Sequence, residues 1–123
     1  MKKFKDWIPA ITIMMIIFAL SSLPGPAVDA AGLNKYSLQV SSHLILHMLL
    51  TIAYYKATKN IPLSILLTVL YAITDEAHQM FTLLRSPSLF DIYVDSLGSL
   101  ISGLFLWKLL PTLPKKLKIW LND

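Results

Sequence analysis

Ionisable side chains stand near the ends of three apolar segments of this chain. They form three groups: Asp75, Glu76, His78 and the nearby Gln79 at the end of one segment, His43 and His47 at the start of another, and Asp91 and Asp95 leading into a third. Carboxylates and imidazoles act as general acids and bases and as metal ligands. Because charge beside lipid is costly, such groups gathered at one depth indicate a functional site.

The densest group has helical spacing. In a helix Asp75 and His78 would share one face, and Glu76 and Gln79 another, because residues three apart are neighbours. Glu76 and Asp75 are therefore candidate catalytic acids or bases, or ligands for a cation. The alternative is a helix end whose acids lie in the water of the headgroup layer.

Two further pairs have a spacing of four residues. His43 and His47 would lie on one helix face, where two imidazoles can share one metal; alternatively, each is bonded to a neighbouring helix. Asp91 has a structural explanation as part of a capping box that begins at Ser88. Asp95 lies one turn further along and has no such explanation. The sequence requires no cofactor, but His43, His47 and Asp95 are candidate ligands for a divalent metal.

Arg85 precedes the start of the last apolar segment. Its guanidinium could clamp a phosphate or carboxylate through two hydrogen bonds, or form a salt bridge with Glu76 or Asp75. The candidate substrate-binding residues are Arg85, Gln79, His43, Asp91 and Asp95. Small residues follow in the pairs Gly98/Ser102 and Ser99/Gly103, a spacing typical of closely packed membrane helices.

The composition indicates a membrane protein. The chain has 123 residues, of which 55% are hydrophobic and 15% charged, whereas about 25% are charged in a typical soluble domain. The absence of cysteine excludes disulfides, a thiol nucleophile and a cysteine zinc site. Despite the net charge of +4, nucleic acid is not an expected partner, because the basic residues flank apolar segments and do not alternate with aromatic residues.

Four apolar segments predict an all-α fold, an integral membrane four-helix bundle in one domain, residues 1–123. We expect helices at about 8–23, 40–55, 61–81 and 88–110, followed by a basic amphipathic stub at 111–123. The third segment reaches the roughly 20 residues of a span only if it includes Asp75–Phe81, so the two acids should lie within the helix. The stub would lie on the anionic inner leaflet, or would be a frayed tail.

The placement of Lys and Arg predicts the orientation. With both termini in the cytoplasm, nine basic residues are inside and two, Lys35 and Arg85, are outside; the opposite orientation reverses the ratio and violates the positive-inside rule. The ionisable groups then face outward. A cleavable signal peptide is the alternative for the N-terminal segment, since basic residues, an apolar run and Val28-Asp29-Ala30 follow one another there.

The polar residues resemble those of the VanZ family of small bacterial membrane proteins. The resemblance covers about Ser21 to Gly103 and rests on the series Asp75-Glu76-x-x-Gln79-x-Phe81, Arg85-Ser86-x-Ser88, Asp91 and Gly98, with His43 matching a second-helix histidine and Ser21-Ser22-x-Pro24 a first-helix ending. Asp95 stands where the family often has Asn, His47 where it often has Tyr, and Gln39-Val40 where it often has Asp-Lys.

The resemblance implies a multi-pass protein of the bacterial cytoplasmic membrane, associated with low-level resistance to glycopeptide antibiotics, teicoplanin above all. Three functions stay open. The chain could bind an amphiphile at the outer leaflet, such as a lipoglycopeptide or a cell-wall lipid, with the lipid bilayer as its other partner. It could be a membrane enzyme that acts on lipid-linked phosphates, with Glu76 as acid or base and a metal on His and Asp. It could also be a purely structural bundle.

Overall fold

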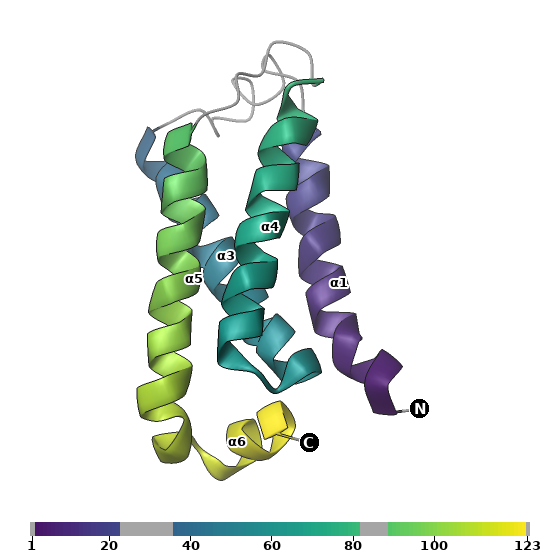
Figure 1. Ribbon diagram of the computed structural model, residues 1–123, viewed down its shortest axis with the longest axis vertical. Coiled ribbons are helices and arrows are strands. Elements are labelled where there is room, and N and C mark those ends of the chain that lie inside the picture. The colour runs from purple at the N-terminus through teal and green to yellow at the C-terminus, as the bar shows by residue number, and fades with distance from the viewer. Residues whose placement is uncertain (1, 23–35, 82–88, 123) are drawn as a thin grey trace.

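All the regular elements in the described part of the chain are helices in a computed structural model (Figure 1). The structure describes residues 2–22, 36–81 and 89–122. Its elements are α1 (Lys2–Ser21), α3 (Tyr36–Thr58), α4 (Ile61–Gln79), α5 (Leu89–Leu109), a short 3-10 turn (Leu110–Thr112) and α6 (Lys115–Asn122). α3 packs against α1, α4 and α5, and α4 packs against α5. The two chain ends lie at one end of the molecule (Figure 1).

The helices are longer than the apolar segments where polar residues extend them. α1 begins at Lys2 instead of residue 8, and α3 covers residues 36–58 instead of 40–55, because lysine and hydroxyl side chains are compatible with a helix even where they end an apolar run. α4 ends at Gln79 and includes Asp75 and Glu76. Both acids therefore lie within a helix, as the sequence predicted.

A two-residue connection makes α3 and α4 antiparallel neighbours. Lys59 has a φ of 57°, the left-handed conformation that commonly ends a helix. Asn60 then begins α4, because its side-chain Oδ1 accepts a hydrogen bond from the Leu63 amide at 3.0 Å. Pro62 in the first turn fits there since that position needs no amide hydrogen.

Glycines of α5 allow close contact with two helices. A Cβ on Gly98 would lie 2.8 Å from the Leu44 carbonyl oxygen of α3, and one on Gly103 would lie 2.5 Å from the Ile65 side chain of α4. Ser102, one turn after Gly98, donates a hydrogen bond to the Met48 carbonyl at 2.8 Å. One face of α5 is thereby fixed against α3, with the backbones nearly touching.

The C-terminal segment forms a helix that docks on the end of α3. Leu121 of α6 is buried in a cluster with Tyr55 and Leu106. The ammonium of Lys56 donates to the Trp120 carbonyl at 2.6 Å, and that of Lys59 donates to the Leu121 carbonyl. These two cations satisfy carbonyls at the C-terminus of α6, where positive charge is favourable.

Two segments within the described ranges are long and apolar enough to cross a membrane by length and composition, Phe4–Ser21 and Leu89–Thr112. The sequence predicted four spans. α3 and α4 do not meet that criterion, and they carry the histidines, Asp75 and Glu76, which lower their hydropathy. Large hydrophobic side chains are nevertheless exposed on all four long helices, including Phe18, Leu49, Leu70 and Leu104. Such an extensive apolar surface is typical of contact with lipid.

Candidate functional site

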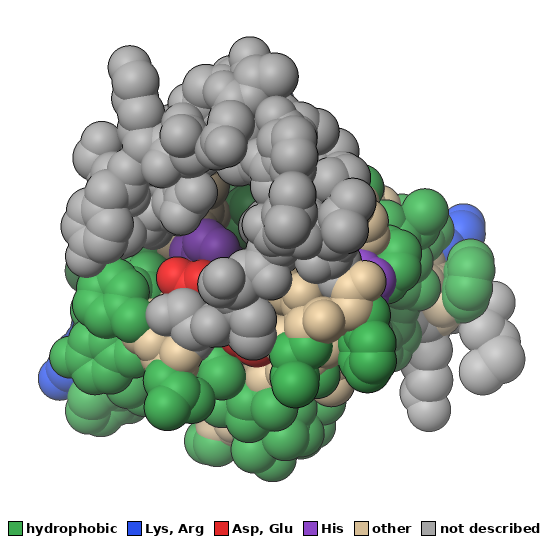
Figure 2. All heavy atoms as spheres, turned by 90° about the horizontal axis from the view of Figure 1, so that it is seen from above, with side chains coloured by type: hydrophobic (Ala, Val, Ile, Leu, Met, Phe, Trp, Pro, Cys, Tyr) green, Lys and Arg blue, Asp and Glu red, His purple; other side chains and the backbone are tan. Residues whose placement is uncertain are grey.

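Ionisable side chains from three helices and a serine from a fourth meet at one end of the molecule, which we call the polar end. It comprises Ser21 at the end of α1, His43 and His47 in α3, Asp75 and Glu76 in α4, and Asp95 in α5. It lies opposite the two chain ends (Figure 1). Figure 2, which views this end, shows His and Asp or Glu side chains close together among hydrophobic side chains.

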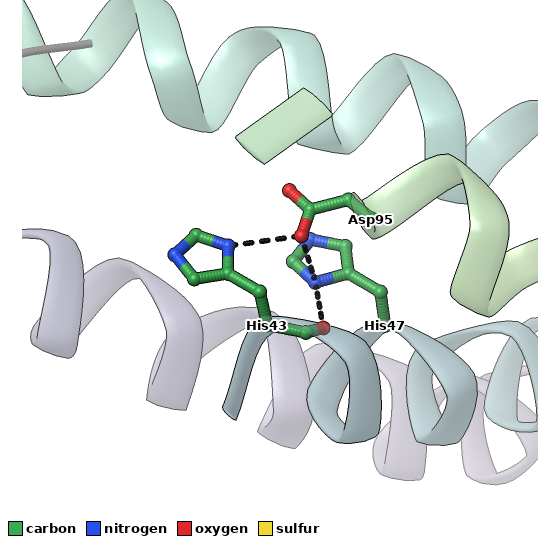
Figure 3. A group of neighbouring side chains, drawn as sticks. All are labelled: His43, His47 and Asp95. Atoms are coloured by element: carbon green, nitrogen blue, oxygen red, sulfur yellow. Dashed lines mark hydrogen bonds and ion pairs between the residues drawn. The ribbon is translucent and has the colours of Figure 1, made fainter. Parts of the chain in front are cut away.

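Asp95 lies between the two histidines (Figure 3). Its Oδ1 is 2.9 Å from His43 Nδ1 and 3.2 Å from His47 Nδ1. The two imidazole rings are stacked nearly parallel, with their centroids 6.0 Å apart and an interplanar angle of 2°. Asp95 is 0% exposed and His47 is 1% exposed, whereas the His43 side chain keeps 19% exposure. The carboxylate and both imidazoles thus form one compact and largely buried cluster.

The contact between α3 and α5 sets this arrangement. Asp95 is about one turn from Gly98, whose missing side chain lets α5 approach the α3 backbone. Ser102 bonds to α3 on the same face. Helical periodicity therefore directs Asp95 toward α3, where His43 and His47 lie one turn apart.

The backbone fixes the tautomer of His47. Its Nδ1–H donates a hydrogen bond to the His43 carbonyl oxygen at 2.9 Å, since a carbonyl can only accept. In the neutral ring Nε2 then carries the lone pair. This Nε2 is buried and has no hydrogen-bond partner among the described residues, and the same holds for Asp95 Oδ2 and Asp75 Oδ2. With a neutral imidazole and ionised carboxylates, all three are acceptor atoms.

Asp75 forms the second part of the polar end. It is 4% exposed, and its Oδ1 accepts a hydrogen bond from the Ser21 hydroxyl of α1. Asp75 is close enough to His43, His47 and Asp95 for their charges to interact. The α3–α5 cluster and the acid of α4 therefore belong to one site.

The other residues predicted on α4 occupy different positions. Glu76 and Gln79 are buried at 4% and 2% exposure. His78 is only partly buried and lies toward α1, where its Nε2 is 2.9 Å from Ser22 Oγ and its ring stacks on Phe18. Asp75, Glu76 and Gln79 thus face the interior, whereas His78 belongs to the α1–α4 contact.

The predictions for Arg85 and for the capping box of Asp91 involve residues outside the described ranges. Arg85 lies outside the described residues, as does Ser88, the expected capping partner of Asp91. Asp91 itself lies in the first turn of α5. Sequence reasoning missed Ser21 as the partner of Asp75. The Ser21-Ser22 pair at the end of an apolar run was the signal that could have identified it.

The polar end is rich in carboxylates. Asp75, Glu76 and Asp95 are all buried there. Over the ranges that the structure covers, the lysines lie toward the opposite end, in the first turns of α1, at the end of α3, at the end of α5 and in α6. The described part of the site consequently suits hydrogen-bond donors and cations better than a bare anion.

The helical fold, its apolar surface and the buried ionisable cluster at one end define a small helical protein of the membrane type. A family model described as VanZ/LLP1 matches residues 4–111, and the chain belongs to this family. This confirms the family assignment made from the polar series. No curated protein matches the chain, and no solved structure does.

Proposed function

We propose that this chain binds the head group of an amphiphile at its polar end, at the outer leaflet of the bacterial cytoplasmic membrane. One observation carries the proposal: His47 Nε2, Asp75 Oδ2 and Asp95 Oδ2 are buried at the same end without a hydrogen-bond partner in the described structure. An unsatisfied buried acceptor costs about 1–3 kcal/mol. Three of them in one small region are better explained by a ligand than by stability, which argues against a purely structural bundle.

The chemistry of these atoms selects the kind of head group. Carboxylates accept hydrogen bonds, and so does the free nitrogen of a neutral imidazole. Sugar hydroxyls and amines are matching donors. A lipoglycopeptide such as teicoplanin and a sugar-bearing cell-wall lipid both combine such donors with acyl chains, which would lie along the exposed apolar faces of the helices. Glu76, Gln79, Arg85 and Asp91 are the further candidates for contact.

The proposed orientation places the polar end outside the cell. In it α1, α3, α4 and α5 form a four-helix bundle across the membrane, with both termini in the cytoplasm. Lys56, Lys59 and the lysines of α6 then lie at the inner surface, as the positive-inside rule favours. α6 exposes Ile119 and Trp120 beside its lysines, a combination that suits the anionic inner leaflet.

Ligand binding in nanodiscs tests the proposal. Titration with teicoplanin, and separately with a glycopeptide that lacks the acyl chain, should give saturable binding of the acylated compound only. Asp75→Asn should weaken this binding by about tenfold, the loss expected of one charge-assisted hydrogen bond. Thr74→Ala, on the exposed side of the same helix, is the control. Equal binding by Asp75→Asn and the unaltered protein would contradict the proposed site.

A membrane enzyme that acts on lipid-linked phosphates is the second candidate. The hydrogen bond between His43 Nδ1 and Asp95 Oδ1 favours it, because a carboxylate that holds one imidazole nitrogen leaves the other available as a general base. Inorganic phosphate released from a lipid-linked diphosphate in the same nanodiscs, and its loss in His43→Gln, would identify this activity.

A further inference from the structure

We infer that His43, His47 and Asp95 form a binding site for a divalent transition-metal ion of the zinc class. The ion would take two of the buried acceptors on which the proposed function rests, His47 Nε2 and Asp95 Oδ2, so the metal is tested below without any amphiphile. Each of the three residues offers one ligand atom, and these atoms all lie within 4.8 Å of one another. Two imidazoles and one carboxylate are a donor set found in catalytic zinc sites, which keep a further position open.

The distance between two candidate ligand atoms is close to the distance between ligand atoms around a bound zinc ion. Zinc lies about 2.0–2.2 Å from nitrogen and oxygen ligands, so tetrahedral ligands are about 3.3–3.6 Å apart. Asp95 Oδ1 is 2.9 Å from His43 Nδ1, and one ligand atom of each of the three residues lies within 4.8 Å of the others. His47 would bind through Nε2, because its Nδ1 donates to the His43 carbonyl. Small side-chain adjustments are therefore enough for an ion to replace the hydrogen bond between His43 and Asp95.

The orientation of His47 supports a ligand role. Metal-binding histidines usually donate their other nitrogen to a carbonyl or carboxylate, which fixes the ring and makes the free nitrogen a better ligand. His47 Nδ1 donates in this way to the His43 carbonyl. Its Nε2 lone pair and Asp95 Oδ2 are buried without a partner in the described structure. In a hydrogen-bond network that only stabilises the fold, His47 Nε2 and Asp95 Oδ2 would both have hydrogen-bond partners.

The identity of the residues fits the zinc class. Imidazole favours Zn²⁺, Co²⁺, Ni²⁺ and Cu²⁺ over Mg²⁺ and Ca²⁺, which prefer oxygen ligands only. Asp75, which is buried at the polar end and interacts electrostatically with the cluster, also favours a cation there. Partly exposed His43 provides the side from which an ion would enter.

Metal titration of the purified chain in detergent tests the inference. Zn²⁺ alone should bind at one ion per chain, measured by calorimetry and by elemental analysis after gel filtration. Co²⁺ alone should give the visible absorption bands of a four- or five-coordinate ion. Asp95→Asn, His47→Gln and His43→Gln should each weaken Zn²⁺ binding at least tenfold and abolish the Co²⁺ bands. His78→Gln is the matched control, because His78 lies at the same end but bonds to Ser22 outside the cluster.

Each outcome decides the question. A single ion lost in the three cluster variants and kept in His78→Gln supports the site. Absence of stoichiometric binding in the unaltered chain overturns it, and so does binding that His78→Gln weakens as much as the cluster variants do. If Asp95→Asn or His47→Gln fails to fold, His43→Gln decides alone, since partly exposed His43 is the member least important for packing. Unchanged binding in that folded variant would refute the inference.

Discussion

Asp95 is the residue through which two helices make one site. Its side chain belongs to α5, while both of its neighbours, His43 and His47, belong to α3. A buried carboxylate without a partner would be strongly destabilising, so the register of the two helices is energetically tied to this cluster. An amide in place of Asp95 would lack the negative charge that the proposed metal site requires.

Substitution of Glu76 tests whether the acids on α4 have a function. Glu76→Gln keeps the shape of the side chain and removes its charge. Under the proposed function, the chain confers teicoplanin resistance on a susceptible host, and we expect the variant to lose it, because the site would lose an acceptor for ligand donors. Its melting temperature should fall by no more than about 4 °C, which corresponds to ~1 kcal/mol.

Thr74→Ala is the control for Glu76→Gln, since Thr74 is exposed on the same helix. It should retain both resistance and thermal stability. Full resistance in Glu76→Gln would mean that Glu76 is only an acid near the membrane surface. A large loss of stability would instead make Glu76 a structural partner.

The sequence predicted which residues form the site better than it predicted the contacts between them. The spacing of His43 and His47 placed them on one face, and the length of the third segment placed Asp75 and Glu76 within a helix. The sequence named Asp95 with the two histidines as candidate metal ligands, but the contacts between them could not be predicted, because they depend on how far α5 slides along α3. That register is set by Gly98 against Leu44, a contact between residues far apart in sequence.

At the scale of elements, the contact between α3 and α5 controls the geometry of the site. Gly98→Ala would place a Cβ 2.8 Å from a backbone oxygen that cannot rotate away. Gly103→Ala meets mainly the tip of the Ile65 side chain, which can change rotamer. Gly98→Ala should therefore destabilise the protein more, by about 1–3 kcal/mol, and should also weaken Zn²⁺ binding.

Thermal denaturation of the two glycine variants in one detergent, followed by circular dichroism, measures the difference. Gly103→Ala is the control for a small-residue contact away from the site. It should keep the metal affinity of the unaltered chain. Equal losses of stability and affinity in both variants would show that close approach of α3 to α5 at Gly98 does not position Asp95.

For the whole molecule, the two ends have opposite chemical character. One end gathers Asp75, Glu76 and Asp95, and the other gathers lysines around the docked helix α6. The sequence predicted this separation from the positions of Lys and Arg. It left the C-terminal stub either on the membrane surface or frayed, because docking depends on one residue, Leu121, whose burial against Tyr55 and Leu106 requires the folded α3 and α5.

The proposed orientation has the polar end facing the outside of the cell, and the absence of native cysteine makes this orientation directly measurable. Met80→Cys places a thiol on an exposed position beside the polar end, and Lys116→Cys places one on α6. A maleimide that cannot cross membranes should label Met80→Cys in intact cells and Lys116→Cys only after lysis. Labelling of Lys116→Cys in intact cells, with Met80→Cys protected until lysis, would show that the polar end faces the cytoplasm.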